Sequence, residues 1–308
     1  MHIRTLVKFI LRTTLKKNYY NNILALKSEY GCFISVFIHN LIVYFAPNRI
    51  LNKNNNLKGA RIKFKKISNN LYLILKEGKK IYFEDPQRWF TFRYKYDFSN
   101  IPLDRAKSYK IEKYIKLYPN DTVIDIGANL GFFSQYCILK KTNIIAIEAE
   151  KNIFRALQAN CSAYEKISFH NLAITNKNGK NFMGSPINSD MDSFSLIIDK
   201  NNIDISTIDE VKCKTLDTLV DEIGLKKIKL IKCDAEGAES EVLQGAIKTL
   251  QMTEYIAFDC GKERLGKDTL SECKKIISKQ GFEILEAENV PRFLLFAKNK
   301  NLVLPLFD

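Results

Sequence analysis

Asp121-Thr-Val-Ile-Asp-Ile-Gly-Ala-Asn-Leu-Gly131 is the stretch that decides the fold of this chain. The β-branched residues within 123–126 are typical of a strand that is covered on both faces of a sheet. Gly127 and Gly131 let the backbone turn sharply and approach a ligand with no side chain in the way. The stretch therefore predicts a buried strand, a glycine turn and a following helix.

A second apolar segment, Asn143-Ile-Ile-Ala-Ile147, follows this turn and ends on Glu148. A glycine turn after one strand and a carboxylate at the end of the next can hold a nucleoside, with the carboxylate on the ribose hydroxyls. The dinucleotide fingerprint has a second glycine where this chain has Asn129. We expect Asp125 to face the cofactor, where its charge suits the ammonium group of S-adenosylmethionine better than a pyrophosphate. These residues favour a methyltransferase over a dehydrogenase.

Two motifs resemble those of the FkbM-type S-adenosylmethionine-dependent methyltransferases. The first is Asp125-Ile-Gly-Ala-Asn-Leu-Gly131. The second consists of Thr215-Leu-Asp-Thr-Leu219, followed by Leu230-Ile-Lys-Cys-Asp-Ala-Glu-Gly-Ala-Glu239 and Val242-Leu-Gln-Gly-Ala246. The resemblance covers residues 107–299. It implies a Rossmann-like methyltransferase fold and O-methylation of a hydroxyl on a sugar, glycan or polyketide-like molecule. The chain departs from the family pattern at Phe258-Asp-Cys260, where many members end the fifth strand on Glu.

The predicted cofactor site combines the glycine turn, the end of the second strand and Asn171-Leu-Ala173, which also resembles the family pattern. In an open α/β sheet the ligand lies over the carboxyl ends of the strands. The residues predicted to bind S-adenosylmethionine are Asp125, Gly127, Ala128, Asn129, Gly131, Glu148, Ala149 and Ala173.

The catalytic candidates are carboxylates that follow the fourth and fifth strands: Asp234, Glu236 and Asp259. Methyl transfer to a hydroxyl requires that the oxygen be placed against the sulfonium methyl and that its proton be removed. Two other roles stay open for Asp234. It can cap the following helix, or it can join Glu236 and Asp259 in holding a divalent metal ion. The resemblance does not imply a metal, and we predict none.

Strand and helix patterns alternate along residues 101–308, which we predict to form the methyltransferase domain. The expected strands are 122–126, 143–148, 167–170, 228–233, 254–259, 282–286 and 293–297, and the expected helices are 107–117, 131–140, 151–162, 215–223, 238–250 and 267–280. This order predicts an α/β fold with a seven-stranded, mostly parallel sheet and helices on both faces. Residues 1–100 are predicted to be a separate basic extension with helices, a β-hairpin around Glu77-Gly78 and an aromatic segment.

The net charge of +14 comes from the N-terminal part of the chain. Residues 1–118 carry 24 Lys and Arg against 7 Asp and Glu, whereas the remainder carries 24 against 27. Such a basic region indicates contact with an anionic membrane surface, nucleic acid or charged glycan, or simply a solvated surface. The seven cysteines are scattered and form no C-x-x-C pair, which argues against a disulfide framework or structural zinc. We therefore predict a cytoplasmic protein, with peripheral membrane contact through the extension.

The predicted function is S-adenosylmethionine-dependent O-methylation of a hydroxyl on a sugar, glycan or related small molecule. The alternative is a nucleic-acid methyltransferase, for RNA in particular, that uses the basic N-terminal region. Amino-methylating enzymes of that kind usually carry Asn/Asp-Pro-Pro-Tyr/Phe where this chain has Asp234-Ala-Glu-Gly237, and carboxylates there would repel phosphates. A non-catalytic binding protein is disfavoured by the intact glycine turn and Glu148.

The extension is expected to contact membrane without crossing it. Residues 2–17 have the pattern of a basic amphipathic helix, and the apolar run 32–46 is shorter than the roughly 20 residues that span a bilayer. The full chain should therefore sediment with anionic vesicles and be released by high salt, and removal of residues 1–50 should abolish binding. Resistance to salt and alkaline carbonate would indicate a spanning helix, and protein that never sediments would indicate a packed helical cap.

Overall fold

The chain divides into two compact units, residues 1–101 and 102–308. The computed structural model describes residues 63–76, 78–86, 88, 100–185, 195–196, 203–264, 266–287 and 293–302. The predicted N-terminal helices within residues 1–46 and most of the aromatic segment lie outside these ranges. Within the described ranges, no helix is both long enough and apolar enough to cross a membrane.

The described part of the first unit is a three-stranded antiparallel sheet of β1 (Lys63–Ser68), β2 (Leu71–Lys76) and β3 (Lys79–Phe83). The predicted hairpin is confirmed as β2 and β3. Strand β1 was not predicted, because its sequence is rich in lysine and only Phe64 in it is buried. The Phe64 ring lies 5.8 Å from that of Tyr72 and 5.9 Å from that of Phe83, and these aromatic contacts form the core of the small sheet.

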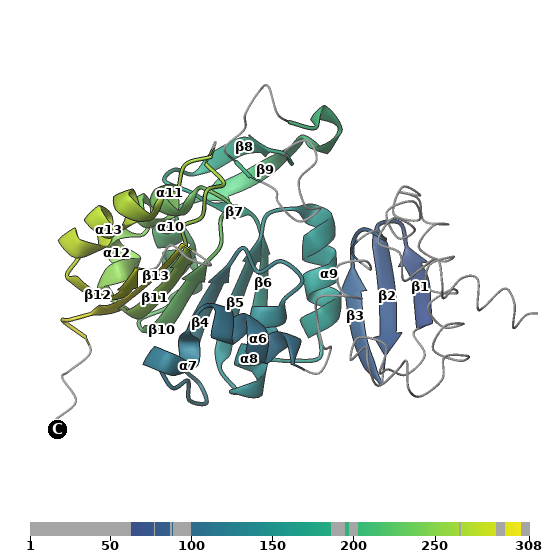
Figure 1. Ribbon diagram of the computed structural model, residues 1–308, viewed down its shortest axis with the longest axis horizontal. Coiled ribbons are helices and arrows are strands. Elements are labelled where there is room, and N and C mark those ends of the chain that lie inside the picture. Colours follow the sequence, from purple (N-terminus) through teal and green to yellow (C-terminus); the bar gives the residue numbers. More distant parts are fainter. Residues whose placement is uncertain are drawn as a thin grey trace, which may run out of the picture. The chain divides into compact units, whose positions relative to one another are not determined.

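The second unit is built on a seven-stranded sheet in the order β12-β13-β11-β10-β4-β5-β6 (Figure 1). The strands are β4 (Thr122–Ile126), β5 (Asn143–Glu148), β6 (Ile167–Asn171), β10 (Ile228–Cys233), β11 (Thr253–Asp259), β12 (Phe282–Ala287) and β13 (Leu294–Asn299). Six strands point in the same direction, and β13 runs antiparallel to them between β11 and β12. All seven predicted strands are confirmed. The order is that of a doubly wound sheet whose last strand is inserted beside the edge strand.

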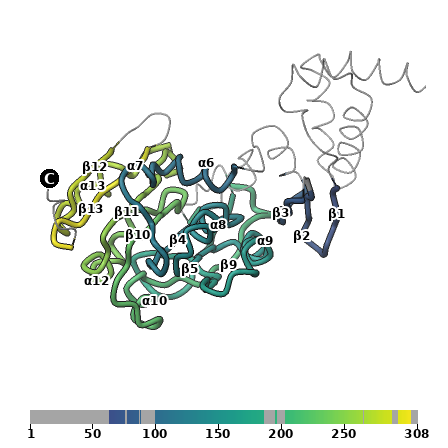
Figure 2. Tube along the Cα trace, turned by 90° about the horizontal axis from the view of Figure 1, so that it is seen from below, coloured from purple at the N-terminus to yellow at the C-terminus, as the bar shows by residue number. Residues whose placement is uncertain are grey.

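Helices cover both faces of this sheet. They are α6 (Ile101–Ser108), α7 (Ile111–Tyr114), α8 (Phe132–Leu139), α9 (Lys151–Cys161), α10 (Leu216–Ile223), α11 (Glu239–Gln244), α12 (Ile247–Gln251) and α13 (Leu270–Lys279). Successive strand residues point to opposite faces, so Ile124 packs with α10 to α13 while Val123 packs with α6 to α9. Figure 2 shows these layers, with α6 and α7 on one side of β4 and β10, and α10 and α12 on the other.

Two predicted helices are each divided in the structure. The predicted helix 238–250 is interrupted at Gly245, where a Cβ atom would lie 2.2 Å from the carbonyl oxygen of Thr175. The predicted helix 107–117 is interrupted at Lys110, whose φ of +53° belongs to the left-handed region. In both places a contact with a distant segment overrides the helical pattern of the sequence.

A second small sheet, which the sequence analysis missed, lies beside the carboxyl end of the central sheet. It consists of β7 (Ala173–Ile174), β9 (Asp209–Lys214) and β8 (Gly179–Met183) in that order. Only Met183 of β8 is buried, so the strand lacks the apolar alternation by which strands are recognised.

A buried ion pair joins the two central strands of the main sheet. Asp125 of β4 lies directly opposite Lys232 of β10, and Lys232 Nζ is 3.1 Å from Asp125 Oδ1. The exposed fractions of the two residues are 0% and 3%. Ser134 Oγ donates to Asp125 Oδ2 at 2.7 Å, and Lys232 Nζ donates to the carbonyl oxygen of Gly127 at 2.8 Å. The pair therefore supports the glycine turn from beneath.

The Lys232→Met variant should lower the free energy of unfolding by about 3–5 kcal/mol, because it leaves a buried carboxylate without its counter-charge. The double variant Asp125→Asn/Lys232→Met should recover much of this loss, since neither partner then carries a charge. Urea denaturation of the wild type, both single variants and the double variant measures the coupling. Additive losses would contradict a specific pairing of these two residues.

Candidate functional site

Three residues of the glycine turn adopt left-handed backbone conformations: Gly127 at φ +64°, Asn129 at +52° and Gly131 at +83°. Gly127 is required by a close approach, because a Cβ atom there would lie 1.9 Å from the carbonyl oxygen of Asp234. Asp234 N also donates to the carbonyl oxygen of Ile126 at 3.1 Å. The two motifs identified in the sequence therefore meet backbone to backbone at the carboxyl ends of β4 and β10.

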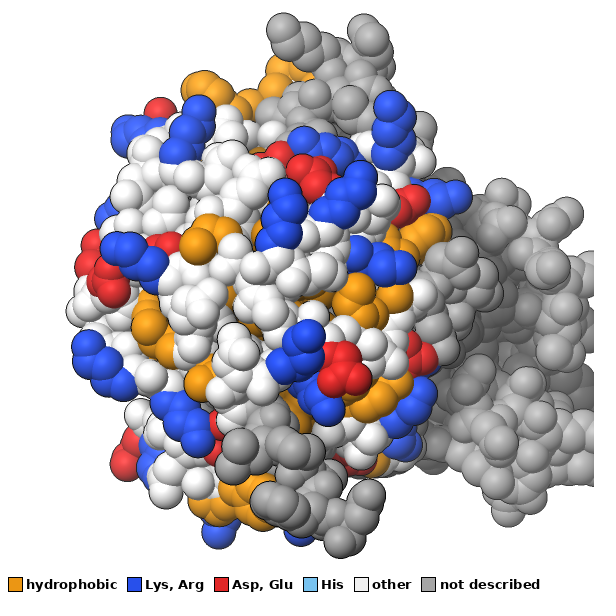
Figure 3. Space-filling model, turned by 90° about the vertical axis from the view of Figure 1, so that its left-hand side faces the viewer, with side chains coloured by type: hydrophobic (Ala, Val, Ile, Leu, Met, Phe, Trp, Pro, Cys, Tyr) orange, Lys and Arg blue, Asp and Glu red, His pale blue; other side chains and the backbone are white. Residues whose placement is uncertain are grey.

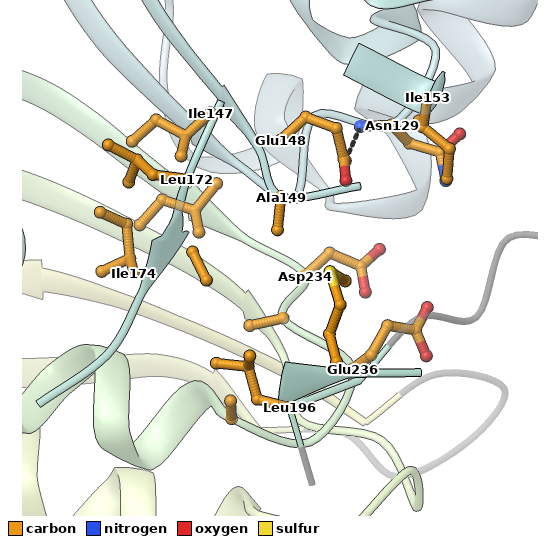
Figure 4. Close-up of a pocket in the computed structure, with 16 residues that line it drawn as sticks. Asn129, Ile147, Glu148, Ala149, Ile153, Leu172, Ile174, Leu196, Asp234 and Glu236 are labelled. Atoms are coloured by element: carbon orange, nitrogen blue, oxygen red, sulfur yellow. Dashed lines mark hydrogen bonds between the residues drawn. The ribbon is translucent and has the colours of Figure 1, made fainter. Parts of the chain in front are cut away.

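A cavity opens above this meeting point and holds about 660 Å³ of empty space that is open to solvent. Figure 4 shows that its polar side chains gather on one side: Asn129, Glu148, Asp234 and Glu236. The opposite side is lined by aliphatic side chains: Ile147, Leu172, Ile174 and Leu196. A cavity with one apolar and one polar side suits a ligand that has an aromatic ring and several polar groups.

The structure brings most of the predicted site residues together around this cavity. The predicted residues that line it are Gly127, Asn129, Glu148, Ala149, Ala173, Asp234 and Glu236. The remaining four do not line it: Asp125, Ala128, Gly131 and Asp259. Which of these residues contact a bound cofactor or acceptor stays a prediction.

The position of Asp125 differs from the expectation that its charge faces the cofactor. Its carboxylate is fully buried on the α8 face of the sheet, where Lys232 and Ser134 bind it. Gly131 is the N-cap residue that precedes α8, and a Cβ atom there would lie 2.7 Å from the side chain of Leu157. Asp125 and Gly131 therefore support the glycine turn and do not line the cavity.

Ala128 and Asp259 also lie outside the cavity lining. The backbone N–H of Ala128 donates to the carbonyl oxygen of Ile147 at 2.9 Å and thereby ties the turn to β5. Asp259 ends β11, which pairs with β10 on the side away from β4. The arrangement therefore gives no support to Asp259 as a third catalytic carboxylate beside Asp234 and Glu236.

Glu148 ends β5 and projects toward the cavity (Figure 4). Its Oε2 accepts from Asn129 N at 2.9 Å, and its Oε1 accepts from Glu150 N at 3.0 Å. These bonds fix the carboxylate between the glycine turn and the start of α9. An ionised carboxylate offers about four acceptor positions, so this geometry is compatible with further bonds to a ribose diol.

Asp234 follows β10, and its Oδ2 accepts from the hydroxyl of Tyr109 at 2.6 Å. Tyr109 lies 125 residues earlier in the chain and is fully buried. The sequence analysis missed both Tyr109 and Lys232 as parts of the site. A lysine in a strand buried on both faces was a usable signal for Lys232, since such a charge needs a buried partner. Nothing in the sequence pattern marked Tyr109.

The segment after Asp234 is held in a strained conformation. Glu236 has φ +48°, which is rare for a residue with a side chain. Ser195 Oγ donates to its carbonyl oxygen at 2.7 Å. On the other side, Glu239 Oε1 accepts from Ala235 N at 3.0 Å and from Gly237 N at 3.1 Å. Burial raises the pKa of Glu239 to about 7.

Helix capping does not explain Asp234. Helix α11 begins at Glu239 after Ala238, which makes no side-chain capping bond, and the carboxylate that serves this loop belongs to Glu239. The metal hypothesis also gains no support. Among the residues described, no group of three or more His, Cys, Asp or Glu side chains is arranged to hold a metal ion.

Residues 125–284 match the methyltransferase FkbM domain, which is just over half of the chain. The chain therefore belongs to the FkbM methyltransferase family. It is 26% identical to the 2-O-methyltransferase NoeI of Sinorhizobium fredii over 205 residues, covering 62% of this chain and 82% of that protein. It is 25% identical to the AMB antimetabolite synthetase AmbE of Pseudomonas aeruginosa over 211 residues, or 55% of this chain and 10% of that much longer protein.

Solved structures of similar fold include an S-adenosylmethionine-dependent methyltransferase from Aquifex aeolicus. It matches this chain with a TM-score of 0.39 and 15% identity, and the match covers 66% of this chain and 94% of that one. The fibrillarin pre-rRNA processing protein of Methanococcus jannaschii has a TM-score of 0.41 at 18% identity, covering 78% and 98%. Together with family membership, the strand order described above identifies the fold as the Rossmann-like methyltransferase fold.

The cofactor of this methyltransferase is S-adenosylmethionine, and the cavity fits it. Gly127 lines the cavity without a side chain, because a Cβ atom there would collide with the carbonyl oxygen of Asp234. Glu148, Leu172 and Ile174 line the cavity. We expect Glu148 to bind the ribose hydroxyls and the two aliphatic side chains to contact adenine. This division predicts adenosine near β5 and β6, with the methionine portion above β4 and β10.

The Glu148→Gln variant should bind S-adenosylmethionine about tenfold to a hundredfold more weakly. It removes a hydrogen bond to a charged group, which contributes roughly 1.5–3 kcal/mol, while keeping a carbonyl that can accept from Asn129 N or Glu150 N. Isothermal calorimetry measures the affinity, and an unchanged melting temperature confirms that the turn is intact. Wild-type affinity in the folded variant would show that Glu148 does not bind the cofactor.

Proposed function

We propose that this protein is an S-adenosylmethionine-dependent O-methyltransferase that acts on a hydroxyl of a sugar, glycan or related small molecule. The observation that carries the proposal is that Glu148 and Asp234 line one cavity, so that cofactor binding and acceptor positioning share a site. NoeI, which is 26% identical to this chain over 205 residues, is named as a 2-O-methyltransferase and supports an oxygen acceptor.

Bound S-adenosylmethionine would supply an electrophilic methyl group with a neutral thioether as the leaving group. The protein must hold an acceptor oxygen in line with the methyl carbon and the sulfur. Asp234 is the residue assigned to this task, because it lies at the carboxyl end of β10 beside the turn that approaches the methionine portion. During methyl transfer the Asp234 carboxylate would accept the proton of the acceptor hydroxyl and later release it to solvent.

Glu236 is the second candidate for contact with the acceptor. It lines the same cavity, and its left-handed backbone is held by bonds from both sides. A strained residue that the surroundings keep in place is often part of a functional site. Its carboxylate is suited to accept a hydrogen bond from a neighbouring hydroxyl of a polyol.

The nucleic-acid alternative is not favoured. Among the residues described, the lining of the cavity has no Lys, Arg or His, whereas three carboxylates line it: Glu148, Asp234 and Glu236. On the face in Figure 3, Lys and Arg side chains are dispersed among Asp and Glu side chains. A cysteine nucleophile is also unsuitable, because burial raises the pKa of the Cys233 thiol well above its usual value.

The proposal is tested by methyl transfer from labelled S-adenosylmethionine to glycan, lipid and RNA extracts, followed by the Asp234→Asn variant. Asn nearly preserves the shape of Asp and can still accept from Tyr109, so only the charge and the basicity are lost. We expect turnover to fall at least about a hundredfold, while the affinity for the cofactor persists. Near-normal turnover would remove Asp234 from the mechanism, and label on RNA alone would overturn the acceptor class.

A further inference from the structure

Tyr109 connects the segment before the central sheet to the proposed acceptor site. It occupies the break between α6 and α7, and its ring makes an edge contact with Phe133 of α8 at 5.9 Å between centroids. The side chain is fully buried, and its hydroxyl reaches Asp234 Oδ2 at 2.6 Å. A bond this short between a phenol and a carboxylate is of the strong, charge-assisted kind.

The position of Tyr109 is fixed by the residues that follow it. Lys110 takes the left-handed conformation that breaks the helix, and its Nζ lies 2.5 Å from Glu286 Oε1. Lys113 Nζ lies 3.0 Å from Glu286 Oε2, and the Tyr114 hydroxyl donates to the same oxygen. These three contacts attach the segment that follows Tyr109 to β12 and thereby hold the backbone next to Tyr109.

The ring of Tyr109 also faces the buried ion pair. Lys232 Nζ lies 5.3 Å from the ring centroid while it pairs with Asp125. A cation at the face of a phenol ring withdraws electron density and makes the hydroxyl a better hydrogen-bond donor. Tyr109 therefore links the ion pair beneath the glycine turn to the carboxylate above it.

We propose that Tyr109 is a positioning residue for methyl transfer: its hydroxyl holds the Asp234 carboxylate ionised and oriented toward the acceptor. This inference rests on the proposed function of Asp234. A hydrogen bond to the charged form of a carboxyl group favours that form. Loss of the hydroxyl should therefore make Asp234 harder to ionise and freer to rotate.

Some of the other charged groups around Asp234 favour its ionised form, and others oppose it. Lys232 of β10 favours the ionised form, and its partner Asp125 of β4 opposes it. Glu148 of β5, Glu236 of the following loop and Glu239 of α11 are carboxylates that oppose ionisation when they are charged. Because these groups remain in both variants described below, only the tyrosine hydroxyl differs.

The test compares Tyr109→Phe with a matched control, Tyr136→Phe. Tyr136 is also a buried tyrosine that contacts Phe133, with 6.1 Å between ring centroids, but its hydroxyl donates to Glu112 at 3.1 Å. Both variants thus remove one buried hydroxyl from the same aromatic group. Two properties are measured: the pH profile of kcat for the acceptor found above, and the titration of the Asp234 carboxyl by 13C NMR, assigned by its absence in Asp234→Asn.

For Tyr109→Phe we expect kcat to fall about tenfold or more while the affinity for S-adenosylmethionine is unchanged. The acidic limb of the pH profile and the NMR midpoint should both move up by about one pH unit. Tyr136→Phe should leave both the acidic limb of the pH profile and the NMR midpoint unchanged. In the Asp234→Asn background, adding Tyr109→Phe should cause no further loss of kcat, because the two residues act as one unit.

A Tyr109→Phe variant whose NMR midpoint and pH profile match those of Tyr136→Phe overturns the inference. Equal losses of kcat in the two variants without a shift in either titration also overturn it, since both losses would then be structural. If the wild type transfers no methyl group to any acceptor, the proposed function fails, whereas the NMR titration still decides whether Tyr109 controls the charge of Asp234.

Discussion

The buried ion pair of Asp125 and Lys232 holds together the centre of the second unit, residues 102–308. Taking two charges out of water costs several kcal/mol per ion, and their attraction offsets this only when the geometry is good and other bonds complete it. Ser134 and the carbonyl oxygen of Gly127 complete it here. A slip of one residue between β4 and β10 would turn Lys232 into the apolar cluster on the α10 to α13 face, so the pair strongly specifies the register.

Register matters because the site is assembled from the ends of these two strands. The carbonyl oxygen of Asp234 approaches Gly127 so closely that no side chain fits between them. The glycine turn and the loop that begins at Asp234 are therefore one structural unit, although more than a hundred residues separate them in the chain. The hydrogen bond from Tyr109 attaches a third segment to this unit, and it uses the proposed functional carboxylate to do so.

The strands of the central sheet could be predicted because each is a continuous apolar run, and burial on both faces leaves few alternatives for such runs. The sheet of β7, β9 and β8 could not be predicted, because β8 is mostly exposed. The helix breaks at Lys110 and Gly245 could also not be predicted from the sequence, since each depends on a tertiary contact rather than on local propensity. Residues that line the cavity at strand ends were predictable from topology, whereas Tyr109 became visible only through its distance to Asp234.

The carboxylates near the turn show how one residue type takes different roles from its surroundings. Asp125 is paired with a buried lysine beneath the sheet, and Glu239 accepts backbone N–H groups in a site whose burial raises its pKa to about 7. Glu148 and Asp234 instead line the cavity, and each is fixed by a donor from another element. A general base must be ionised and aimed at the hydroxyl before it can accept a proton, so a hydrogen bond that keeps the Asp234 carboxylate charged and fixed in direction favours this role, although it lowers the basicity of the carboxylate. The network beneath Asp234 is built to provide both.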